Sequence, residues 1–432
     1  MNRYIKKTIR ILLQLVSQAI LWRHKPIVIA ITGSVGKTMT KDIVAHGLSS
    51  VTDVCKSQKN FNTDFGVPLS IIEGENPNGK VLAWFSVILK GINVFFKSEY
   101  HKVLVLEVGT RFPGDIPRIA KWLRPDVSII THIPEVPVHI EFFESRDHIV
   151  DEKSALAKYT KKGGSIILNR DSEYVWNIAK NSKHPIVSVG FNLGADVRAT
   201  NIKRILTNDG QYGLEFIINC KNKIFPVTVP GFVANHQIYG VLFAIAVADT
   251  LGYDVEQVGM AMSSLKPTAG RLRPLVGVRN TLILDDSYNA SPAAMEAAIE
   301  TLKMIDPPAG GSGSKIAVLG DMLDLGKMTM DVHSEIGTML KENTDYVFLV
   351  GPRMEYAYES AIKSKYLKSR IFHFEKPLDV LPHLEKVMKS GDAILVKGSQ
   401  GMRMEKLVAE LIEDKANIKN LIARQDEEWL RS

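Results

Sequence analysis

Cysteine is scarce in this sequence, with only Cys55 and Cys220 among 432 residues. Two cysteines cannot form the disulfide framework that stabilises small secreted proteins, and so low a count fits a reducing cytoplasm. Neither cysteine has a partner at metal-ligand spacing, so no cysteine metal site is expected. We therefore predict a cytoplasmic protein.

The sequence also has no hydrophobic run long enough for a comfortable membrane span. Residues 9–22 come nearest, but they include Gln14, Ser17 and Gln18 and fall short of the ~20 apolar residues that a span needs. Basic residues and Pro26 follow where a signal peptide would carry small residues, so no signal peptide is expected. Residues 1–26 predict an amphipathic basic helix instead. It either packs on the body of the protein, which we favour, or lies in the interface at the inner face of a membrane.

Composition and charge narrow the class of function. Hydrophobic residues make up 45% and charged residues 23% of the chain, as in globular proteins, and its length predicts two or three domains. The net charge of +7 suits an anionic substrate or a membrane surface, or is no more than a basic background. No nucleic-acid motif is present, so no nucleic-acid partner is predicted. The apolar, basic residues 83–97 predict a core helix or, alternatively, a second membrane-facing surface.

Residues 27–40, IVIAITGSVGKTMT, are the most informative part of the sequence. They predict a buried strand, a glycine-rich turn and a helix, an arrangement that binds a nucleotide phosphate through backbone N–H groups and the positive helix end. Lys37 adds a full charge, and the hydroxyl of Thr38 can bind Mg²⁺. Ile31 stands where the strict phosphate-loop (P-loop) pattern has its first glycine, so this is the shorter form Thr-Gly-x-x-Gly-Lys-Thr.

Strand and helix patterns alternate along the chain, as in parallel sheets covered on both faces. A joint at residues 266–274 separates two such series, and the second lacks the Gly-x-Gly-x-x-Gly fingerprint, so no dinucleotide is assigned to it. The predicted fold class is α/β: a P-loop central domain with a parallel sheet (27–268) plus a C-terminal Rossmann-like α/β domain (269–432). The expected strands, hairpin and long helix are residues 103–107, 127–133, 165–169, 214–229 (hairpin), 235–251 (helix), 281–285, 315–319, 346–350, 371–374 and 393–396.

Glu107 ends one of the predicted buried strands and is followed two residues later by a glycine. Ligands of open α/β sheets bind at the carboxyl ends of the strands, so Glu107 is a candidate ligand for the Mg²⁺ that accompanies a nucleotide triphosphate. His139 lies in a predicted loop and Lys153 in a predicted helix. Spacing alone assigns neither of these two residues a role.

Eight ordered segments between residues 27 and 412 closely resemble the Mur ligases, which join a carboxylate to an amine with ATP. Within that family the sequence is most similar to the ligases that add D-alanyl-D-alanine to a peptidoglycan peptide precursor during cell-wall biogenesis. The segments are TGSVGKTMTKD (32–42), KNFNTDFGVPLS (59–70), LEVGTRFPGDI (106–116), HIEFFESRDHIVDEKSAL (139–156), GRL (270–272), DDSYNASPAAM (285–295), VLGDMLDLG (318–326) and VKGSQGMRMEKLV (396–408).

The resemblance implies an acyl-phosphate mechanism with ATP and two Mg²⁺ sites. Lys37, Glu107, His139 and Lys153 would form the catalytic set, with Lys153 at the position that often carries a carbamate. The metal ligands would be Thr38, Glu107, His139 and Lys153. The nucleotide-binding residues would be Gly33, Ser34, Val35, Gly36, Lys37, Thr38, His236, Arg271, Asp286, Tyr288 and Asn289. The substrate-binding residues would be Asn60, Asn62, Arg111, Lys397 and Ser399.

The sequence departs from the family pattern in three places. Only 26 residues precede the first strand, where the family has a domain that holds the uridine nucleotide of the acceptor, so we expect this module to be absent and the acceptor to be held differently. Gln237 and Gly240 replace two asparagines near the adenine, which puts base selectivity in doubt. Arg111 stands in a segment that is usually Ala-Asn-His, where it could meet a different anionic group.

Two alternatives to D-alanyl-D-alanine addition stay open from the sequence. One is the same chemistry with another acceptor, for example a lipid-linked or non-uridine one, or with another amine donor. The other, from a different class, is an inactive nucleotide-binding regulatory protein. The presence of all five of Lys37, Thr38, Glu107, His139 and Lys153 argues against the regulatory protein. The absence of repeats makes a monomer with mobile domains the default expectation.

Overall fold

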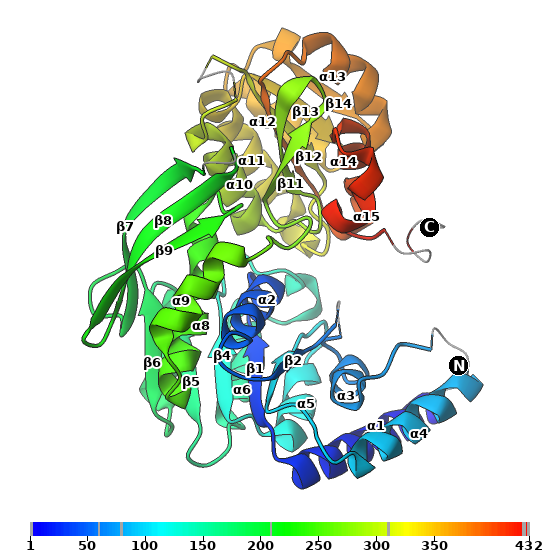
Figure 1. The fold of residues 1–432 in the computed structure, drawn as a ribbon. Helices are drawn as coiled ribbons and strands as arrows, with labels where there is room; N and C mark the ends of the chain where they lie inside the picture. The colour runs from blue at the N-terminus through cyan, green and yellow to red at the C-terminus, as the bar shows by residue number, and fades with distance from the viewer. Residues whose placement is uncertain are drawn as a thin grey trace.

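The computed structural model describes residues 3–58, 61–77, 81–207, 210–308, 312–425 and 429. Within these ranges the chain forms two lobes, each built around its own sheet (Figure 1). The first sheet has nine strands in the order β2-β3-β1-β4-β5-β6-β7-β8-β9, and the second has six in the order β10-β11-β15-β12-β13-β14. The two sheets confirm the predicted α/β class.

The first sheet is parallel at its centre and antiparallel at one end. β1 (Ile27–Thr32) lies between β3 (Val103–Glu107) and β4 (Val127–Ile130), and all three run in the same direction. Their residues are almost all buried, which is why these strands read as continuous apolar runs. The remaining strands are β2 (Val54–Lys56), β5 (Ser165–Asn169), β6 (Ile186–Gly190), β7 (Val197–Leu206), β8 (Tyr212–Cys220) and β9 (Lys223–Pro230), of which β7, β8 and β9 pair antiparallel.

Helices cover both faces of the first sheet and create two separate apolar cores. On one face α2 (Lys37–Leu48) and α8 (Asn235–Leu251) pack together, joined by α9 (Val255–Ala261). On the other face the core contains residues of α1 (Arg3–His24), α3 (Gly66–Ile72) and five further helices and strands. The remaining helices of this lobe are α4 (Val81–Phe96), α5 (Asp115–Leu123), α6 (Arg146–Lys158) and α7 (Glu173–Trp176).

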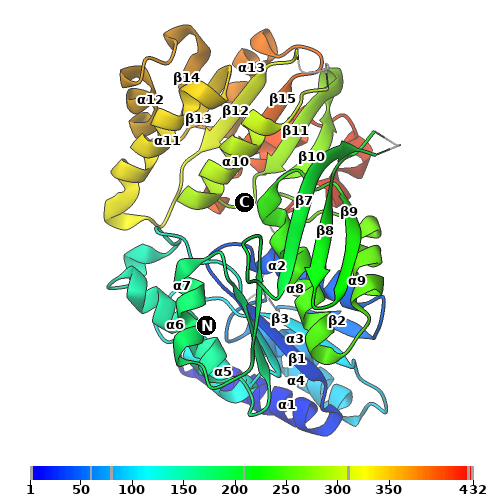
Figure 2. The ribbon, with the colours of Figure 1, turned by 90° about the vertical axis from the view of Figure 1, so that its left-hand side faces the viewer.

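The second sheet is parallel except for its edge strand. β10 (Arg273–Gly277) runs antiparallel to β11 (Thr281–Asp286), and the others follow in parallel. Figure 2 shows α10, α11 and α12 on one face of this sheet. The other strands and helices are β12 (Lys315–Gly320), β13 (Tyr346–Val350), β14 (Ile371–Phe374), β15 (Ala393–Lys397), α10 (Pro292–Met304), α11 (Thr329–Asn343), α12 (Met354–Lys363), α13 (Leu381–Val387), α14 (Glu405–Leu411) and α15 (Ile418–Leu421).

Some predicted boundaries were wrong, and four strands were missed. The helix after the glycine turn was expected at residues 42–48, but α2 begins at Lys37, because the turn ends in a left-handed glycine that starts the helix at once. β4 ends at residue 130 and not 133. β2, β6, β7 and β10 were not predicted. β7 has a register shift between Thr200 and Lys203 that breaks its alternation, and β10 carries Pro274 at a sheet edge.

The helix expected at residues 1–26 is present, and one of its faces packs on the first lobe. Ile9, Leu13 and Ile20 are buried there, which confirms the packing that we favoured. The segment at residues 83–97 belongs to α4, which packs beside α1. No helix in the described part of the chain combines the length and the apolar character required to cross a bilayer.

Candidate active site

A cleft of about 1120 Å³ separates the two lobes and contains most of the predicted site residues. The carboxyl ends of β1 and β3 open into it from the first lobe, and those of β11 and β15 from the second. Among the predicted site residues that the structure describes, only Gly33 and Lys153 do not line the cleft. Asn60 lies outside the described residues. A second hollow of about 670 Å³, beside Asp196 and Asp249, contains none of them.

The glycine turn has the geometry that phosphate binding requires. Gly33 has φ +145°, and a Cβ there would lie 2.0 Å from Thr131 Oγ1, so only glycine fits. Gly36, with φ +87°, is the N-cap of α2, and no side chain caps the helix, so its first N–H groups face the cleft. Ser34 Oγ is buried without a hydrogen-bond partner in the described structure, a polar atom that a phosphate oxygen would satisfy.

Lys37 folds over this turn. Its Nζ donates to the carbonyl oxygens of Gly33 at 3.0 Å and Ser34 at 3.4 Å. Burial lowers the pKa of Lys37 below its ordinary value. The negative charge of Glu107 offsets part of this shift, and the positive charge of Arg271 adds to it. A lysine that donates to two carbonyl oxygens, on a turn of open N–H groups, is arranged for an anion.

Thr38 and Glu107 meet directly at the floor of the cleft. Thr38 Oγ1 donates to Glu107 Oε2 at 2.9 Å, and Asn62 Nδ2 donates to Glu107 Oε1 at 2.9 Å. The Glu107 N–H donates to Ser57 Oγ at 3.1 Å, and Glu107 as a whole is only 2% exposed. The Thr38 hydroxyl and the Glu107 carboxylate therefore place two hard oxygen atoms side by side, next to the phosphate turn.

This donor set fits Mg²⁺ together with a nucleotide. Within the described ranges, no three His, Cys, Asp or Glu side chains are grouped so that they could hold a metal ion alone. Mg²⁺ is usually held by one or two protein oxygens, several waters and the phosphate oxygens of the substrate. Thr38 and Glu107 would therefore hold such an ion, while a closed protein cage for a metal is not formed by the described residues.

His139 and Lys153 approach the turn from two other elements. His139, at φ +66°, faces the cleft, and its Nδ1 lies 3.1 Å from Asp324 Oδ2 of the second lobe. Burial and Lys37 lower the pKa of His139, whereas Asp324 raises it. Lys153, on α6, is 4% exposed and donates from Nζ to the Gly33 carbonyl oxygen at 2.9 Å. Burial, with the charge of Lys37, holds the pKa of Lys153 well below its ordinary value, which favours a neutral amine.

The second lobe contributes a charged pair and an aromatic ring. Lys397 Nζ donates to Asp286 Oδ2 at 2.7 Å and to the Asn289 carbonyl oxygen at 3.0 Å. The Arg271 guanidinium lies 4.1 Å from the centre of the Tyr288 ring. These groups line the cleft across from the phosphate turn. Arg271, Asp286, Tyr288 and Asn289 were predicted to bind the nucleotide, and Lys397 to bind the substrate. Ser399 also lines it, and its Oγ accepts a hydrogen bond from the Leu323 N–H at 2.9 Å.

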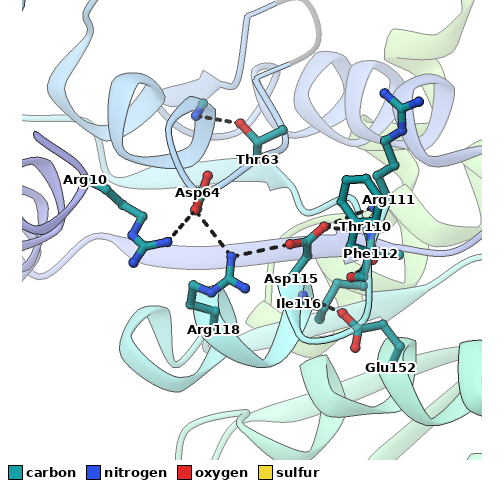
Figure 3. Close-up of polar contacts among 11 residues, drawn as sticks. Arg10, Thr63, Asp64, Thr110, Arg111, Phe112, Asp115, Ile116, Arg118 and Glu152 are labelled. Carbon is teal, nitrogen blue, oxygen red and sulfur yellow. Dashed lines mark hydrogen bonds and ion pairs between the residues drawn. The ribbon is translucent and has the colours of Figure 1, made fainter. Parts of the chain in front are cut away.

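Polar contacts order the side of the cleft that is lined by Arg111, Phe112 and Asp115 (Figure 3). The N–H groups of Arg111 and Phe112 donate to Asp115 Oδ2 at 3.1 and 3.0 Å. The Arg111 guanidinium lies 5.7 Å from the centre of the Phe112 ring and 5.2 Å from that of Phe142. Glu152, beside Lys153 on α6, holds the end of the same loop by accepting from the N–H groups of Gly114 and Ile116 at 2.8 and 2.7 Å.

The two departures near the predicted adenine position have structural explanations. Gln237 Oε1 accepts from the N–H groups of Val233 and Ala234, and its Nε2 donates to the Arg271 carbonyl oxygen at 3.3 Å, so the side chain ties α8 to the joint between the lobes. Gly240 is buried where α8 crosses α2, and a Cβ there would lie 2.3 Å from Ile43 Cδ1. His236, the third residue of this region, lines the cleft as expected.

The two halves of the chain match known domains. Residues 31–248 match the Mur ligase middle domain, and residues 270–400 match the Mur ligase glutamate ligase domain. The chain belongs to the Mur ligase family. It is therefore an ATP-dependent ligase of the Mur type, as the resemblance of its eight segments implied.

Individual Mur ligases align along most of this chain. The UDP-N-acetylmuramoyl-tripeptide–D-alanyl-D-alanine ligase of Bacillus subtilis is 29% identical over 402 residues, which cover 93% of this chain and 79% of that enzyme. The structure of MurF from Acinetobacter baumannii has a TM-score of 0.77 at 26% identity, over 94% of this chain and 81% of that one. MurF of Thermotoga maritima, in complex with ADP, has the same fold with a TM-score of 0.73 at 24% identity, over 97% and 85% of the two chains.

Sequence reasoning missed four residues that support the site. Thr131 fills the space at Gly33 and donates to the Val35 carbonyl oxygen at 2.7 Å. Glu152 and Gln237 fix two loops, and Asp324 faces His139 from across the cleft. Asp324 and Glu152 lie inside segments that resemble the family, so their presence there was the only available signal.

Proposed function

We propose that this Mur ligase adds D-alanyl-D-alanine to the peptide of a UDP-N-acetylmuramoyl-tripeptide acceptor. The observation that carries the proposal is the open phosphate turn at residues 33–38 beside the Thr38–Glu107 contact of 2.9 Å, facing Arg271 and Asp286 across one cleft. The named relatives that align with most of this chain are ligases of that substrate pair. The function belongs to peptidoglycan biosynthesis, and so to cell shape.

The residues divide the chemistry into two steps. In the first, an oxygen of the acceptor carboxylate forms a bond to the γ-phosphorus of ATP, and the bond from that phosphorus to the β-phosphate oxygen breaks. Lys37 and the N–H groups of the turn hold the phosphoryl oxygens as charge redistributes over them. Thr38 and Glu107 would hold the Mg²⁺, which would supply further positive charge for that transfer. In the second step the amine of the donor attacks the acyl carbon, phosphate leaves, and the amine proton passes to solvent.

Lys153 is proposed to act as a carbamate. Its neutral amine, favoured by burial beside Lys37, can add CO₂ and release a proton, which converts a lysine into an anion. That anion and His139 would hold a second Mg²⁺ near the γ-phosphate. NMR with ¹³C-bicarbonate tests the modification: a carbamate signal in the wild type that is missing from Lys153→Met supports it. Full ligation without any such signal contradicts it.

The acceptor side is proposed to use Asn62 and Arg111, with Lys397 and Ser399 from the second lobe. The Arg111 guanidinium is presented at the cleft on two aromatic rings, which suits an anionic group of the acceptor. His236, Tyr288 and Asn289, with Arg271, would surround the base and ribose of ATP. We further propose that the enzyme works in the cytoplasm, with peripheral membrane contact through residues 1–26.

Acceptor-dependent phosphate release tests the function. The wild type is mixed with ATP, Mg²⁺, UDP-N-acetylmuramoyl-tripeptide and D-alanyl-D-alanine, and each component is omitted in turn. We expect phosphate release only in the complete mixture, with one amide formed per phosphate, and no release by Glu107→Gln. Phosphate release that ignores the acceptor favours the regulatory protein. Release supported by another amine but not by D-alanyl-D-alanine shows a Mur ligase of different specificity.

A further inference from the structure

α1 is apolar on two faces, although the first lobe covers only one of them. Ile9, Leu13 and Ile20 are buried against that lobe. Tyr4, Ile11, Leu15 and Trp22 follow at intervals of seven, four and seven residues and are 80%, 44%, 55% and 74% exposed. At 3.6 residues per turn this second set forms one stripe on roughly the opposite side of the helix.

α4 repeats the pattern of α1. Its Trp84, Val87 and Val94 are buried. Its outward stripe, at intervals of four, three and four residues, is Phe85, Leu89, Ile92 and Phe96, which are 64%, 46%, 42% and 73% exposed. A helix with one solvent-facing side normally carries polar residues on that side. An apolar stripe there indicates a surface that binds another molecule or a membrane.

The two stripes lie on the same side of the helix pair. A Cβ at Gly91 would lie 2.4 Å from Val16 Cγ1, and Arg23 Nε donates to the Phe95 carbonyl oxygen at 3.0 Å, so the helices run parallel in close contact. With that contact fixed, helical periodicity turns both stripes away from the first sheet. Figure 1 shows α1 and α4 side by side at the end of the first lobe farthest from the second lobe.

The charged residues of the two helices themselves are all basic. Neither helix contains an acidic residue. Lys6 and Lys7 are exposed and have no carboxylate partner in the described structure, and Arg23 and Lys90 are also exposed. Aromatic rings next to lysine and arginine are the composition of segments that lie at a lipid headgroup boundary, and the basic residues select anionic lipids.

We propose that the eight outward side chains of α1 and α4 form a membrane-docking face, which inserts into the interface of a bilayer rich in anionic lipids. A second copy of the chain is a weaker match, because a symmetric contact through this face would bring the same unpaired lysines together. The face is defined by Tyr4, Ile11, Leu15, Trp22, Phe85, Leu89, Ile92 and Phe96.

The docking face is linked to the acceptor side of the cleft. Arg10 of α1 pairs with Asp64 at 3.2 Å, and Asp64 pairs with Arg118 at 3.4 Å (Figure 3). Arg118 in turn contacts Asp115 at 3.4 Å, the carboxylate that holds the Arg111 loop. A docked enzyme would therefore present its acceptor loops from an element that rests on the lipid surface. Docking itself does not depend on the proposed ligase activity.

Cosedimentation of the full chain with vesicles tests the proposal. The vesicles are phosphatidylglycerol with phosphatidylethanolamine, or phosphatidylcholine alone. We expect binding to the anionic vesicles that falls at high salt, and about a tenfold or greater loss in Trp22→Ser/Phe96→Ser. Lys6→Glu/Lys7→Glu should lose binding to the same vesicles. The matched control is Leu193→Ser/Ile224→Ser, which removes two apolar side chains that are 83% and 70% exposed elsewhere, and it should bind like the wild type.

Three results would overturn the docking face. They are no binding of the wild type to anionic vesicles, equal binding by Trp22→Ser/Phe96→Ser, or equal losses in the control. Light scattering that shows a wild-type dimer, lost in Trp22→Ser/Phe96→Ser, would assign the face to a second copy instead. Phosphate release with soluble substrates is measured on every variant. Lost vesicle binding with normal release separates docking from catalysis, and it also shows that the variants fold.

Discussion

Gly33 accepts hydrogen bonds from two lysines and also packs closely against a threonine. Its carbonyl oxygen accepts hydrogen bonds from Lys37 and Lys153 at 3.0 and 2.9 Å, and its missing side chain leaves room for Thr131. Two ammonium groups near one carbonyl repel each other, which is one reason why the pKa of Lys153 falls well below its ordinary value. The phosphate turn and the lysine proposed to carry a carbamate are therefore electrostatically coupled.

Lys37→Ala should abolish measurable ligation and leave the fold intact. Loss of one preorganised charge contact to the transition state costs about 3–4 kcal/mol, or roughly two to three orders of magnitude in kcat. Thermal unfolding and steady-state turnover are measured together with Lys363→Ala, which removes a lysine whose side chain is 78% exposed on α12. Normal turnover by Lys37→Ala would refute the assignment of the turn to phosphate.

The buried carboxyl group of Asp285 should make the stability of the folded protein depend on pH. Burial raises its pKa from 3.8 to about 6, although Ser287 and Gly270 donate hydrogen bonds to it. The folded state binds this proton more tightly than the unfolded state, so the contribution to stability is complete below pH 3.8 and is lost as the pH rises through about 6. The loss is at most about 3 kcal/mol.

Urea unfolding of the wild type and Asp285→Asn measures this dependence. The wild type should lose stability relative to the variant between pH 4 and about 7 and then run parallel to it. Because the amide of Asp285→Asn changes the hydrogen bonds, we also expect a difference in unfolding free energy between the two proteins that does not vary with pH. A difference that stays constant from pH 4 to 8 would show that Asp285 does not titrate in this range.

The site residues that the sequence identified are those whose position along the chain fixes their position in space. Lys37 and Thr38 follow a strand and a glycine turn, and Glu107 ends a neighbouring strand, so the parallel sheet brings them together. Gln237 shows the limit of this reasoning. Its contacts are with the joint, 34 residues away along the chain, and only the packed structure reveals that partner.

At the scale of elements, the crossing of α2 and α8 positions the phosphate turn. α2 begins at Lys37, and its far side packs on α8 through Ile43 and Gly240. The glycine lets the two helices approach, which fixes the helix whose first turn faces the cleft. Gly240 is thus a packing residue, and the sequence comparison had placed it near the adenine because asparagine is usual at that position.

Gly240→Asn, which introduces the residue usual in the family, should destabilise this protein by about 1–3 kcal/mol through overpacking. Its Cβ would meet Ile43 Cδ1 at 2.3 Å. In an Ile43→Ala background, Gly240→Asn should cost less unfolding free energy than it does in the wild type, because the clashing methyl group is gone. Unfolding free energies from urea titration give all three values. Additive effects of the two substitutions would mean that the contact does not decide the packing.

Strands in the sheet centres were predictable because burial on both faces makes them apolar throughout, as in β3, β5 and β13. Of the strands that escaped prediction, β2 and β10 are at sheet edges, β7 is in the antiparallel extension and β6 lies beside β7. There, one face is exposed and a bulge or a proline interrupts the pattern, as in β7 and β10. The boundary of α2 was missed because a left-handed glycine can start a helix without any side-chain cap.

On the scale of the whole molecule, the two lobes meet at a joint held by few, specific bonds. The Gly270 N–H donates to Asp285 at 3.0 Å, the Leu272 N–H donates to Asp286 at 3.1 Å, and Gln237 binds the Arg271 carbonyl. The lobes have largely separate cores, although Val233 and Ala234 pack into the core of the second lobe. The lobes can therefore move as units while the joint bends. Closure would bring Arg271 and the second lobe onto a nucleotide held by the first.

A crystal structure with Mg²⁺ and a non-hydrolysable ATP analogue tests the central claim most directly. We predict β- and γ-phosphates on the N–H groups of residues 33–38, with Lys37 Nζ moved from the Gly33 carbonyl onto the phosphates and Mg²⁺ between Thr38 and Glu107. A triphosphate bound elsewhere, with the glycine turn unchanged and Lys37 still on its carbonyl partners, would contradict the account.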